Sequence, residues 1–171
     1  RVLAVSNHSK YTSRESREDA GKLAENLGIE CRNMPIDDLF KAYIGEFNED
    51  GNPIYDLAEE NIQARIRGDI WMFISNREGY MVISASNKSE LNVGYTTLYG
   101  DMCGGLAPLS DIYKSQVYEL CHFVNREREI IPESIITKAP SAELRPEQKD
   151  ADSLPPYSIL DKVLYMHLEE G

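Results

Sequence analysis

The chain has 171 residues, of which 42% are hydrophobic and 27% are charged, and these proportions fit one globular domain with a sizeable core. Its formal net charge of -11 argues against a nucleic-acid partner, because non-specific binding to nucleic acid depends on an excess of Lys and Arg. No apolar run reaches the ~20 residues that a membrane helix needs, so we expect no membrane partner either.

Cysteine and histidine residues do not cluster in this sequence. The cysteines, Cys31, Cys103 and Cys121, are widely spaced and form no Cys-x-x-Cys pair. Unpaired cysteines of this kind are typical of the reducing cytoplasm and argue against a zinc cluster. The histidines are equally dispersed, so the sequence predicts a cytoplasmic protein without a histidine metal triad or a Ser/His/Asp site.

The beginning of the chain alternates strand and helix patterns. Residues 1–6 form a short apolar run typical of a buried strand, and residues 15–27 carry apolar side chains at helical spacing before Gly28. A second strand is predicted over 30–36, with a new helix beginning near 35–38. This order indicates a parallel sheet with helical crossovers.

The longest helical pattern covers residues 57–76, after a segment over 44–53 with the composition of a loop. Asn61 and Arg65 lie four residues apart on its polar edge, where a solvated surface is the alternative to a binding role. Gly68 costs a helix about 1 kcal/mol relative to Ala, which indicates close contact with another backbone, such as that of a second subunit; a glycine that the helix merely tolerates is the alternative. The predicted apolar face consists of Ile62, Ile66, Ile70, Phe73 and Ile74.

The centre of the chain combines a predicted strand over 80–84 with a turn and a helix that begins after Asn87. Open α/β sheets bind anions at such helix N-termini. Lys88 offers a cation for phosphate, and Glu90 offers a hard oxygen ligand for Mg²⁺. Asn87 and Glu90 also match a capping box, so a purely structural role is the alternative.

Two further helices are predicted, one from a cap at Ser110 and Asp111 to about residue 125 and one over 158–168. Lys114 lies off the apolar stripe of the first, where a solvated lysine is the alternative. A short element begins near 131–132. Residues 138–156 carry four prolines among charges, as in a loop, and a disordered linker is the alternative. The predicted inward residues are Tyr113, Val117, Leu120, Cys121, Val124, Ile159, Leu160, Val163 and Leu164.

The segment NKSELNVGYTTLYGDMCGGLAPLSD resembles the signature of the synthetase domain of glutamine-dependent NAD synthetases, which usually contains Thr-Gly-Asn-Lys-Ser-Glu. The likeness extends to ENIQARIRG before it and to YKSQVYEL, IPESII, PSAELRPEQKD and LPPYSILD after it, and so covers nearly the whole chain. It implies that residues 1–171 are part of one such domain, with 138–156 as a loop. The implied fold is an open, mostly parallel α/β sheet with flanking helices, like that of adenine nucleotide alpha hydrolases, incomplete at the N-terminus.

The resemblance also implies a reaction. In this family, ATP adenylates the nicotinate carboxylate of deamido-NAD and releases pyrophosphate, and ammonia then displaces AMP to give NAD. The implied cofactors are ATP and Mg²⁺, and the implied source of ammonia is the protein's own glutaminase domain. Assembly through the synthetase domain implies a homodimer or larger homo-oligomer, for which residues 57–76 are a candidate contact.

The resemblance assigns site residues position by position. Asn61, Arg65 and Glu90 match positions that contact deamido-NAD, and Glu90 also matches a Mg²⁺ ligand. Lys114 and Ser141 match positions that contact ATP. Leu98 stands where ammonia-dependent relatives have a lysine, and it receives no role.

The sequence departs from the family in two respects. Ala85 and Ser86 stand where the family has Thr and Gly, so Ala85 is expected to contact ATP only through its backbone. The loop Ser-Gly-Gly-x-Asp-Ser that cradles pyrophosphate should precede the strand at Arg1, and it does not occur here. The chain also begins without an initiator Met, and the glutaminase domain and a basic tail lie outside it. We therefore expect a fragment that does not turn over alone.

Two other interpretations are open. In the first, the protein has the same fold but ATP activates a different substrate, as in GMP or asparagine synthetases. The ENIQAR and NKSE segments are not typical of those enzymes. The other is a non-catalytic nucleotide-binding or dimerisation module of the same fold, which the replacement at Ala85 and Ser86 favours.

Overall fold

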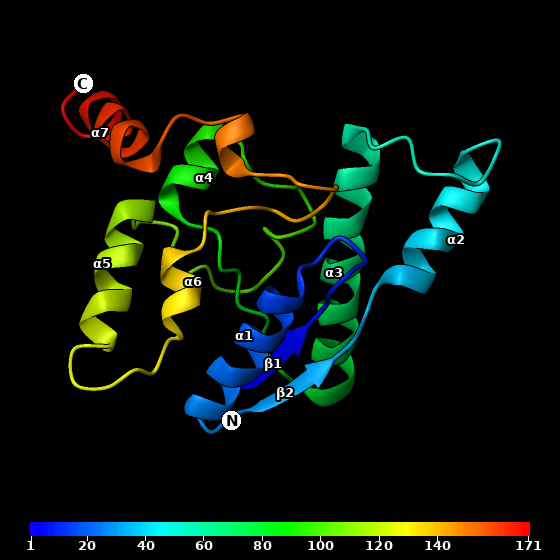
Figure 1. Cartoon of the computed structure of the whole chain (residues 1–171), viewed down its shortest axis with the longest axis horizontal. Helices are drawn as coiled ribbons and strands as arrows, with labels where there is room; N and C mark the ends of the chain where they lie inside the picture. Colours follow the sequence, from blue (N-terminus) through cyan, green and yellow to red (C-terminus); the bar gives the residue numbers. More distant parts are fainter.

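The computed structural model describes residues 1–171 and has the α/β fold expected from the sequence (Figure 1). Seven α-helices surround a small parallel sheet, and none of them combines the length and apolar character needed to cross a bilayer. The elements in chain order are β1 (Leu3–Ser6), α1 (Arg14–Asn26), β2 (Glu30–Asn33), α2 (Asp37–Phe47), α3 (Leu57–Glu78), α4 (Lys88–Val93), α5 (Lys114–Val124), α6 (Glu133–Thr137), the 3-10 helix η1 (Asp150–Asp152) and α7 (Tyr157–Leu168).

The β1-α1-β2 unit is a parallel crossover, as predicted. Its register runs from Leu3 opposite Glu30 to Ser6 opposite Asn33. Gly28 follows the end of α1 with a left-handed φ of +63°, a conformation that glycine adopts without strain. A short turn therefore brings β2 back beside β1, so the carboxyl ends of both strands lie at one edge of the sheet.

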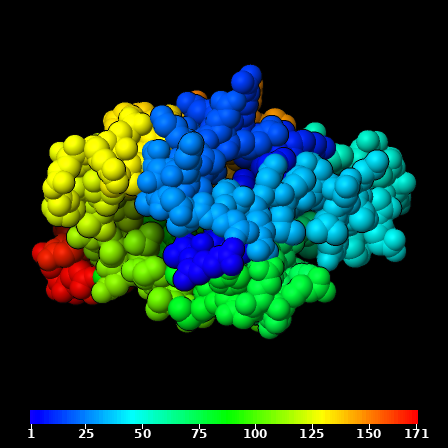
Figure 2. Space-filling model, turned by 90° about the horizontal axis from the view of Figure 1, so that it is seen from below, coloured from blue at the N-terminus to red at the C-terminus, as the bar shows by residue number.

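Helix α3 is the central element and joins the two sides of the molecule. Asp56 caps its first turn by accepting a hydrogen bond from the Glu59 N–H, and Gly79 ends it in the left-handed conformation. Figures 1 and 2 show α2 at one end of the molecule and α7 at the other. In Figure 2 the N-terminal residues lie between the β2 segment and the green segment that includes the end of α3. The buried apolar cluster that fixes α2 on α3 consists of Ile36, Phe40, Ile44 and Ile66.

The glycine within α3 allows a close approach inside the chain, not to a second subunit. A Cβ at Gly68 would lie 2.8 Å from the backbone oxygen of Tyr99, and a Cβ at Gly100 would lie 2.8 Å from the Cβ of Ala64. Both distances are shorter than real Cβ contacts, so the 99–100 backbone packs on α3 only because these two positions lack side chains.

This packing predicts opposite effects for two helical glycines. Gly68→Ala is expected to destabilise the full-length protein by about 1–3 kcal/mol, because the new methyl group overpacks the contact with Tyr99. Gly21→Ala in α1 is the matched control: nothing lies within 4 Å of its Cβ position, so helix propensity should stabilise the protein by about 0.5–1 kcal/mol. Thermal unfolding measures both changes, and equal melting temperatures for the two variants would contradict the packing argument.

Several predictions of local structure were wrong. Residues 80–84 form no strand, because the Ile83–Leu106 bridge is isolated and the opposite side of the segment faces a cavity. Helix α2 continues to Phe47, so the loop predicted from residue 44 begins at Asn48. Helix α5 begins at Lys114, because the Ser110 hydroxyl donates to the Ala107 carbonyl within a turn and does not cap a helix.

Some residues predicted to point inward are exposed. Periodicity identified an apolar face on α3, α5 and α7, but only part of each face is covered by other elements. On α7, Leu160 is buried whereas Ile159 and Val163 are exposed. The exposed members of the three predicted faces are Phe73, Leu120, Val124, Ile159 and Val163.

Candidate nucleotide site

Helix α4 begins with the capping box that the sequence predicted. The Asn87 side chain accepts a hydrogen bond from the Glu90 N–H (3.1 Å), and the Asn87 N–H donates to Oε2 of Glu90 (3.3 Å). The other oxygen, Oε1, accepts a hydrogen bond from Nζ of Lys114 at 2.9 Å. Glu90 therefore both completes its own helix end and forms an ion pair with α5, so the structural and the binding interpretations are compatible.

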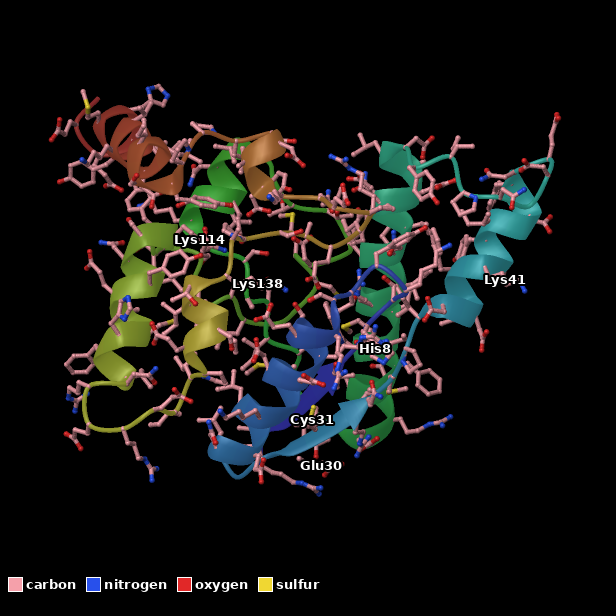
Figure 3. The ribbon with its side chains drawn as sticks, in the orientation of Figure 1. His8, Glu30, Cys31, Lys41, Lys114 and Lys138 are labelled. Atoms are coloured by element: carbon pink, nitrogen blue, oxygen red, sulfur yellow. The ribbon has the colours of Figure 1, made fainter.

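A cavity of about 530 Å³, here called the α4–α5 cavity, opens beside this ion pair. It is lined by side chains from α1, α4, α5 and the segment after α6. Glu90, Lys114 and Ser141 all line it, so the structure brings together three of the residues singled out in the sequence. Lys138 also lines it, and Figure 3 shows Lys114 and Lys138 near one another beside the segment after α6.

Ser141 lies in a loop that is fixed by internal hydrogen bonds. Its hydroxyl donates to the Gln148 carbonyl and accepts from the Glu143 N–H at 3.1 Å. Lys138 Nζ donates to Glu143 and to the Ser13 hydroxyl, both at 2.8 Å, which ties the loop to the start of α1. Burial alone would raise the pKa of Glu143, but hydrogen bonds from Lys138 and neighbouring serines hold that pKa below its ordinary value.

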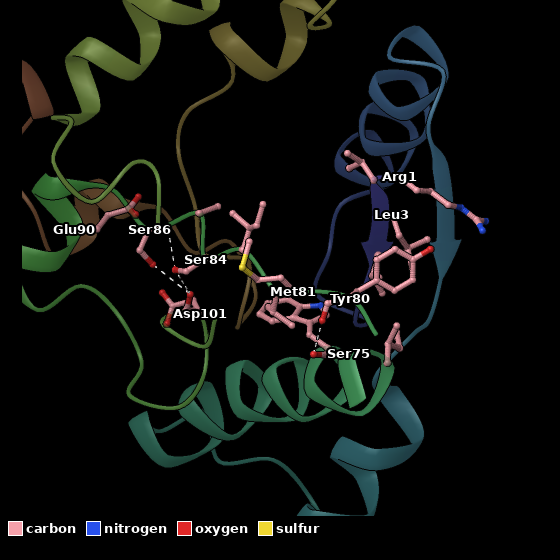
Figure 4. Close-up of a pocket in the computed structure, with 16 residues that line it drawn as sticks. Arg1, Leu3, Ser75, Tyr80, Met81, Ser84, Ser86, Glu90 and Asp101 are labelled. Carbon is pink, nitrogen blue, oxygen red and sulfur yellow. Dashed lines mark hydrogen bonds between the residues drawn. The ribbon is translucent and has the colours of Figure 1, made fainter. Parts of the chain in front are cut away.

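Ala85 lies in a second cavity, here called the β1 cavity, of about 560 Å³ between β1 and the 80–86 segment. Ala85 has no hydroxyl, but its two neighbours do: Ser84 and Ser86 donate to the Asp101 carbonyl at 2.9 and 3.4 Å. Figure 4 shows both serines directed at Asp101, with Glu90 beside them and Leu3 of β1 across the opening. The serine hydroxyls therefore hold the 101 backbone against the turn before α4.

Asn61 and Arg65 lie away from the ion pair, on the face of α3 that carries the 97–101 turn. Asn61 Oδ1 accepts a hydrogen bond from the Thr97 hydroxyl (2.8 Å), and Arg65 Nε donates to the Leu98 carbonyl (3.2 Å). Asn61 lines a third cavity of about 290 Å³, whereas Arg65 lines none of the three cavities described here. The structure thus links these two residues to the turn and not directly to Glu90.

Asp101 connects the three cavities, and sequence reasoning did not single it out. It lines all of them, and its Oδ1 accepts a hydrogen bond from the Thr97 N–H at 2.6 Å. Burial raises the pKa of Asp101, the hydrogen bonds from backbone N–H groups oppose that shift, and the nearby Glu90 adds to it. Nothing in the sequence around Asp101, which follows a glycine in a tight turn, indicates a site residue, because the cavities are visible only in three dimensions.

A group of tyrosines around Asp150 was also missed. Burial raises the pKa of Tyr95 to about 12, with the Asp150 charge as the next cause. The Tyr157 hydroxyl donates to Asp150 Oδ2 at 2.9 Å, and the Tyr157 ring lies 5.3 Å from Lys114 Nζ. Both phenols remain protonated at neutral pH, and Tyr95 and Asp150 give the α4–α5 cavity a wall that is partly aromatic and partly acidic.

Lys88 does not line the α4–α5 cavity, so the structure places this predicted phosphate cation apart from Glu90 and Lys114. Its Nζ donates to Asp111 (3.1 Å) and to Glu169, and these hydrogen bonds raise its pKa. Of Lys88 on α4 and Lys114 on α5, only Lys114 lines the α4–α5 cavity.

The chain contains no group of three or more Asp, Glu, His or Cys side chains placed to hold a metal ion. Glu90 is a single carboxylate on the wall of the α4–α5 cavity. Mg²⁺ is often held by one or two carboxylates with the remaining ligands from phosphate and water. The residues present therefore fit Mg²⁺ that arrives with a nucleotide, and they do not fit a metal held by protein ligands alone.

Comparison with known proteins decides the family. The sequence model described as NAD synthase matches residues 1–171. The chain belongs to the NAD synthase family. Its relatives include glutamine-dependent NAD(+) synthetases of Aquifex aeolicus, 53% identical over 171 residues, and Thermotoga maritima, 51% identical over 176 residues. Each match covers 99% of this chain but only 30% of the relative, so the chain spans less than a third of those proteins.

Solved structures of the NAD synthase family agree with the fold. The glutamine-dependent NAD+ synthetase of Acinetobacter baumannii in complex with ADP is 42% identical with a TM-score of 0.77, and the match covers 99% of this chain and 30% of that one. The NMN synthetase of Francisella tularensis is 29% identical with a TM-score of 0.84, and the match covers 95% of this chain and 65% of that one. The expected resemblance and fold class are thereby confirmed.

Proposed function

We propose that the full-length protein containing this chain is a glutamine-dependent NAD synthetase. It adenylates the nicotinate carboxylate of deamido-NAD with ATP and then amidates it with ammonia, giving NAD, AMP and pyrophosphate. The observation that carries the proposal is the match of the family model to the whole chain, together with 53% identity to a glutamine-dependent NAD(+) synthetase.

The α4–α5 cavity supplies the groups that an adenylating site needs. We assign ATP to the wall that carries Lys114 and Ser141, because a phosphate chain needs a cation and hydrogen-bond donors. The backbone at Ala85, which lines the β1 cavity, is assigned as a further contact. Asn61, Arg65 and Glu90 are assigned to deamido-NAD. When bound, Mg²⁺ neutralises phosphate charge in the transition state, and Glu90 would hold it.

The ion pair between Glu90 and Lys114 suggests how ATP enters this cavity. Without a nucleotide, the two charges neutralise each other at 2.9 Å, and their side chains are only 18% and 20% exposed. A phosphate chain competes for Lys114 because it carries more negative charge than one carboxylate. Once Lys114 turns to the phosphates, an oxygen of Glu90 is free for the Mg²⁺ that accompanies ATP. The residues of the chain then orient the carboxylate and the phosphate and limit the access of water.

The chain is proposed to be part of one synthetase domain and to need further sequence for turnover. The β1 cavity is mainly apolar and lies between β1 and the 80–86 segment, which forms only an isolated bridge. An added strand between them would extend the parallel sheet, and the loop after it would emerge near Glu90 and Asp101. A pyrophosphate-cradling loop at that place would supply the backbone N–H groups that the motif Ser-Gly-Gly-x-Asp-Ser provides in the family.

The direct test uses the full-length protein with ATP, Mg²⁺, deamido-NAD and either glutamine or ammonium. We expect NAD, AMP and pyrophosphate in equal amounts, and no NAD from either nitrogen source would contradict the proposal. Residues 1–171 alone are expected to form no NAD under the same conditions. Turnover by residues 1–171 alone would contradict the need for a further phosphate loop.

The same assay tests two alternative functions of the full-length protein. Because one structural relative is an NMN synthetase, nicotinate mononucleotide is tested beside deamido-NAD as the acceptor. The second alternative is a non-catalytic nucleotide-binding or dimerisation module, which the absence of a Thr hydroxyl at Ala85 favours. ATP binding without AMP formation would support that second interpretation.

Homodimerisation is proposed through the face of α3. Phe73 is 57% exposed near the end of this helix, and the Arg77 guanidinium lies 4.3 Å from its ring. Phe73→Asp is expected to convert a dimer of the full-length protein to a monomer, because a buried unpaired carboxylate is costly at an interface. Light scattering during gel filtration measures the mass, and Glu46→Gln on α2 is a control that should stay dimeric. A monomeric wild-type protein would contradict the proposal.

A further inference from the structure

A buried carboxylate on α7 has no place in the chemistry proposed above. Asp161 is only 5% exposed, yet both of its oxygens are used. Oδ1 accepts a hydrogen bond from the Ser89 hydroxyl on α4 at 2.5 Å, and Oδ2 accepts one from the Ser115 N–H on α5 at 2.8 Å. One side chain therefore joins three helices, α4, α5 and α7, which also contact one another in pairs (Figure 1).

Helix α5 has a local capping contact, in which the Tyr113 N–H donates to Oε1 of Gln116 at 3.0 Å, but its first two N–H groups use distant acceptors. Tyr113 precedes the helix and makes no side-chain capping hydrogen bond. The first N–H of the helix, from Lys114, donates to the Ser89 hydroxyl at 2.8 Å, and the second, from Ser115, donates to Asp161. A carboxylate at a helix N-terminus is favoured by the helix dipole as well as by the hydrogen bond. The acceptor of the Ser115 N–H thus lies 46 residues away in the sequence.

The same hydrogen bonds fix the two charged residues of the α4–α5 cavity. Ser89 immediately precedes Glu90 on α4, and Lys114 is the first residue of α5. Asp161 accepts a hydrogen bond from the Ser89 hydroxyl, and that hydroxyl in turn accepts one from the Lys114 N–H. From these two helix starts the side chains of Glu90 and Lys114 meet at 2.9 Å. Tyr157, one turn earlier on α7, places its ring 5.3 Å from Lys114 Nζ. Helix α7 therefore holds the start of α5 through the Ser115 N–H and contacts the charged end of Lys114 through the Tyr157 ring.

We propose that Asp161 is a positioning residue that sets the separation of Glu90 from Lys114 without touching a substrate. This inference rests on the function proposed above, because it gives Lys114 a role in ATP binding. A positioning role differs from a simple packing role in one respect: the loss of Asp161 should lower activity only when Lys114 is present. Loss of packing alone would lower stability, and its effect on activity would be independent of Lys114.

A double-mutant cycle in the full-length protein distinguishes the two roles. Asp161→Asn keeps the shape of the side chain, but an NH₂ group replaces one of the two acceptor oxygens. Either the Ser89 hydroxyl or the Ser115 N–H then loses its acceptor. We expect this change to lower kcat/KM for ATP about 10-fold or more in the wild-type background and less than about 2-fold in a Lys114→Met background, because residues in one network are not additive. Leu160→Ala, at the adjacent buried position of α7, is the control for packing.

Equal losses of kcat/KM from Asp161→Asn in the two backgrounds would overturn the positioning role. The role would also be overturned if Leu160→Ala lowers kcat/KM as much as Asp161→Asn does when both variants show the same decrease in melting temperature. The proposed function fails separately, if the wild-type protein forms no NAD. In that case equilibrium binding of ATP with Mg²⁺ to the same four proteins of the cycle decides the positioning role by the same criterion. Failure of the wild-type protein to bind ATP would overturn both.

Discussion

Glu90→Gln is expected to lower the turnover of the full-length protein about 100-fold or more, because the change removes the charge that pairs with Lys114 and that is proposed to hold Mg²⁺. Glutamine is accepted at the third position of a capping box, so the N-terminus of α4 should keep its hydrogen bond to Asn87. The change therefore separates the two roles of Glu90. Steady-state formation of NAD measures the loss, and circular dichroism with thermal unfolding checks that the fold is kept.

The control for Glu90→Gln is Glu46→Gln, which removes one negative charge from the exposed surface of α2. We expect wild-type turnover from this control. Wild-type turnover from Glu90→Gln as well would mean that Glu90 only completes its helix. A large decrease in the melting temperature of Glu90→Gln would indicate instead that the ion pair with Lys114 is mainly structural.

Lys114→Met is expected to raise KM for ATP about 10-fold or more, with a smaller effect on KM for deamido-NAD, because a hydrogen bond to a charged group contributes about 1.5–3 kcal/mol. Methionine keeps much of the apolar stem of lysine beside the ring of Tyr157, so the packing of α5 is preserved. Initial rates at varied ATP and fixed deamido-NAD measure the effect.

Lys88→Met is the matched control for Lys114→Met. Lys88 also forms ion pairs on a neighbouring helix end, but with Asp111 and Glu169 and away from the α4–α5 cavity. We expect a lower melting temperature from this control and a KM for ATP within about 2-fold of wild type, since its ion pairs are structural. If both lysine changes raise KM for ATP equally, the assignment of ATP to the α4–α5 cavity is wrong.

The features that the sequence predicted correctly are those set by residues close together in the chain. The capping box of α4 depends on Asn87 and Glu90, and the end of α1 depends on Gly28. The crossover from β1 to β2 follows from the order of short apolar runs around one helix. In each case a local pattern contains the whole physical cause.

The features that the sequence missed depend on distant partners. The first two N–H groups of α5 donate to Ser89 and Asp161, and no pattern around residue 113 reveals these distant acceptors. Tyr80 to Ser84 has the composition of a strand, but a strand also needs a paired neighbour, and one side of this segment faces the β1 cavity. Ile159 and Val163 belong to an apolar face, yet periodicity does not show whether another element covers that face.

The site residues divide in the same way. Glu90, Lys114 and Ser141 were singled out by motif and do line one cavity. Asn61 and Arg65 were singled out with them but contact the turn at Thr97 and Leu98. Asp101, which lines all three cavities, was missed because nothing in its local sequence distinguishes it from an ordinary turn aspartate.

We propose that the ion pair between Glu90 and Lys114 opens to admit ATP with Mg²⁺. A crystal structure of the full-length protein with Mg²⁺ and a non-hydrolysable ATP analogue tests it most directly. We predict that Lys114 Nζ leaves Glu90 and donates to a phosphate oxygen at about 2.8 Å, with Glu90 turned to the metal. A nucleotide bound elsewhere, with the 2.9 Å contact between Lys114 and Glu90 intact, would contradict the claim.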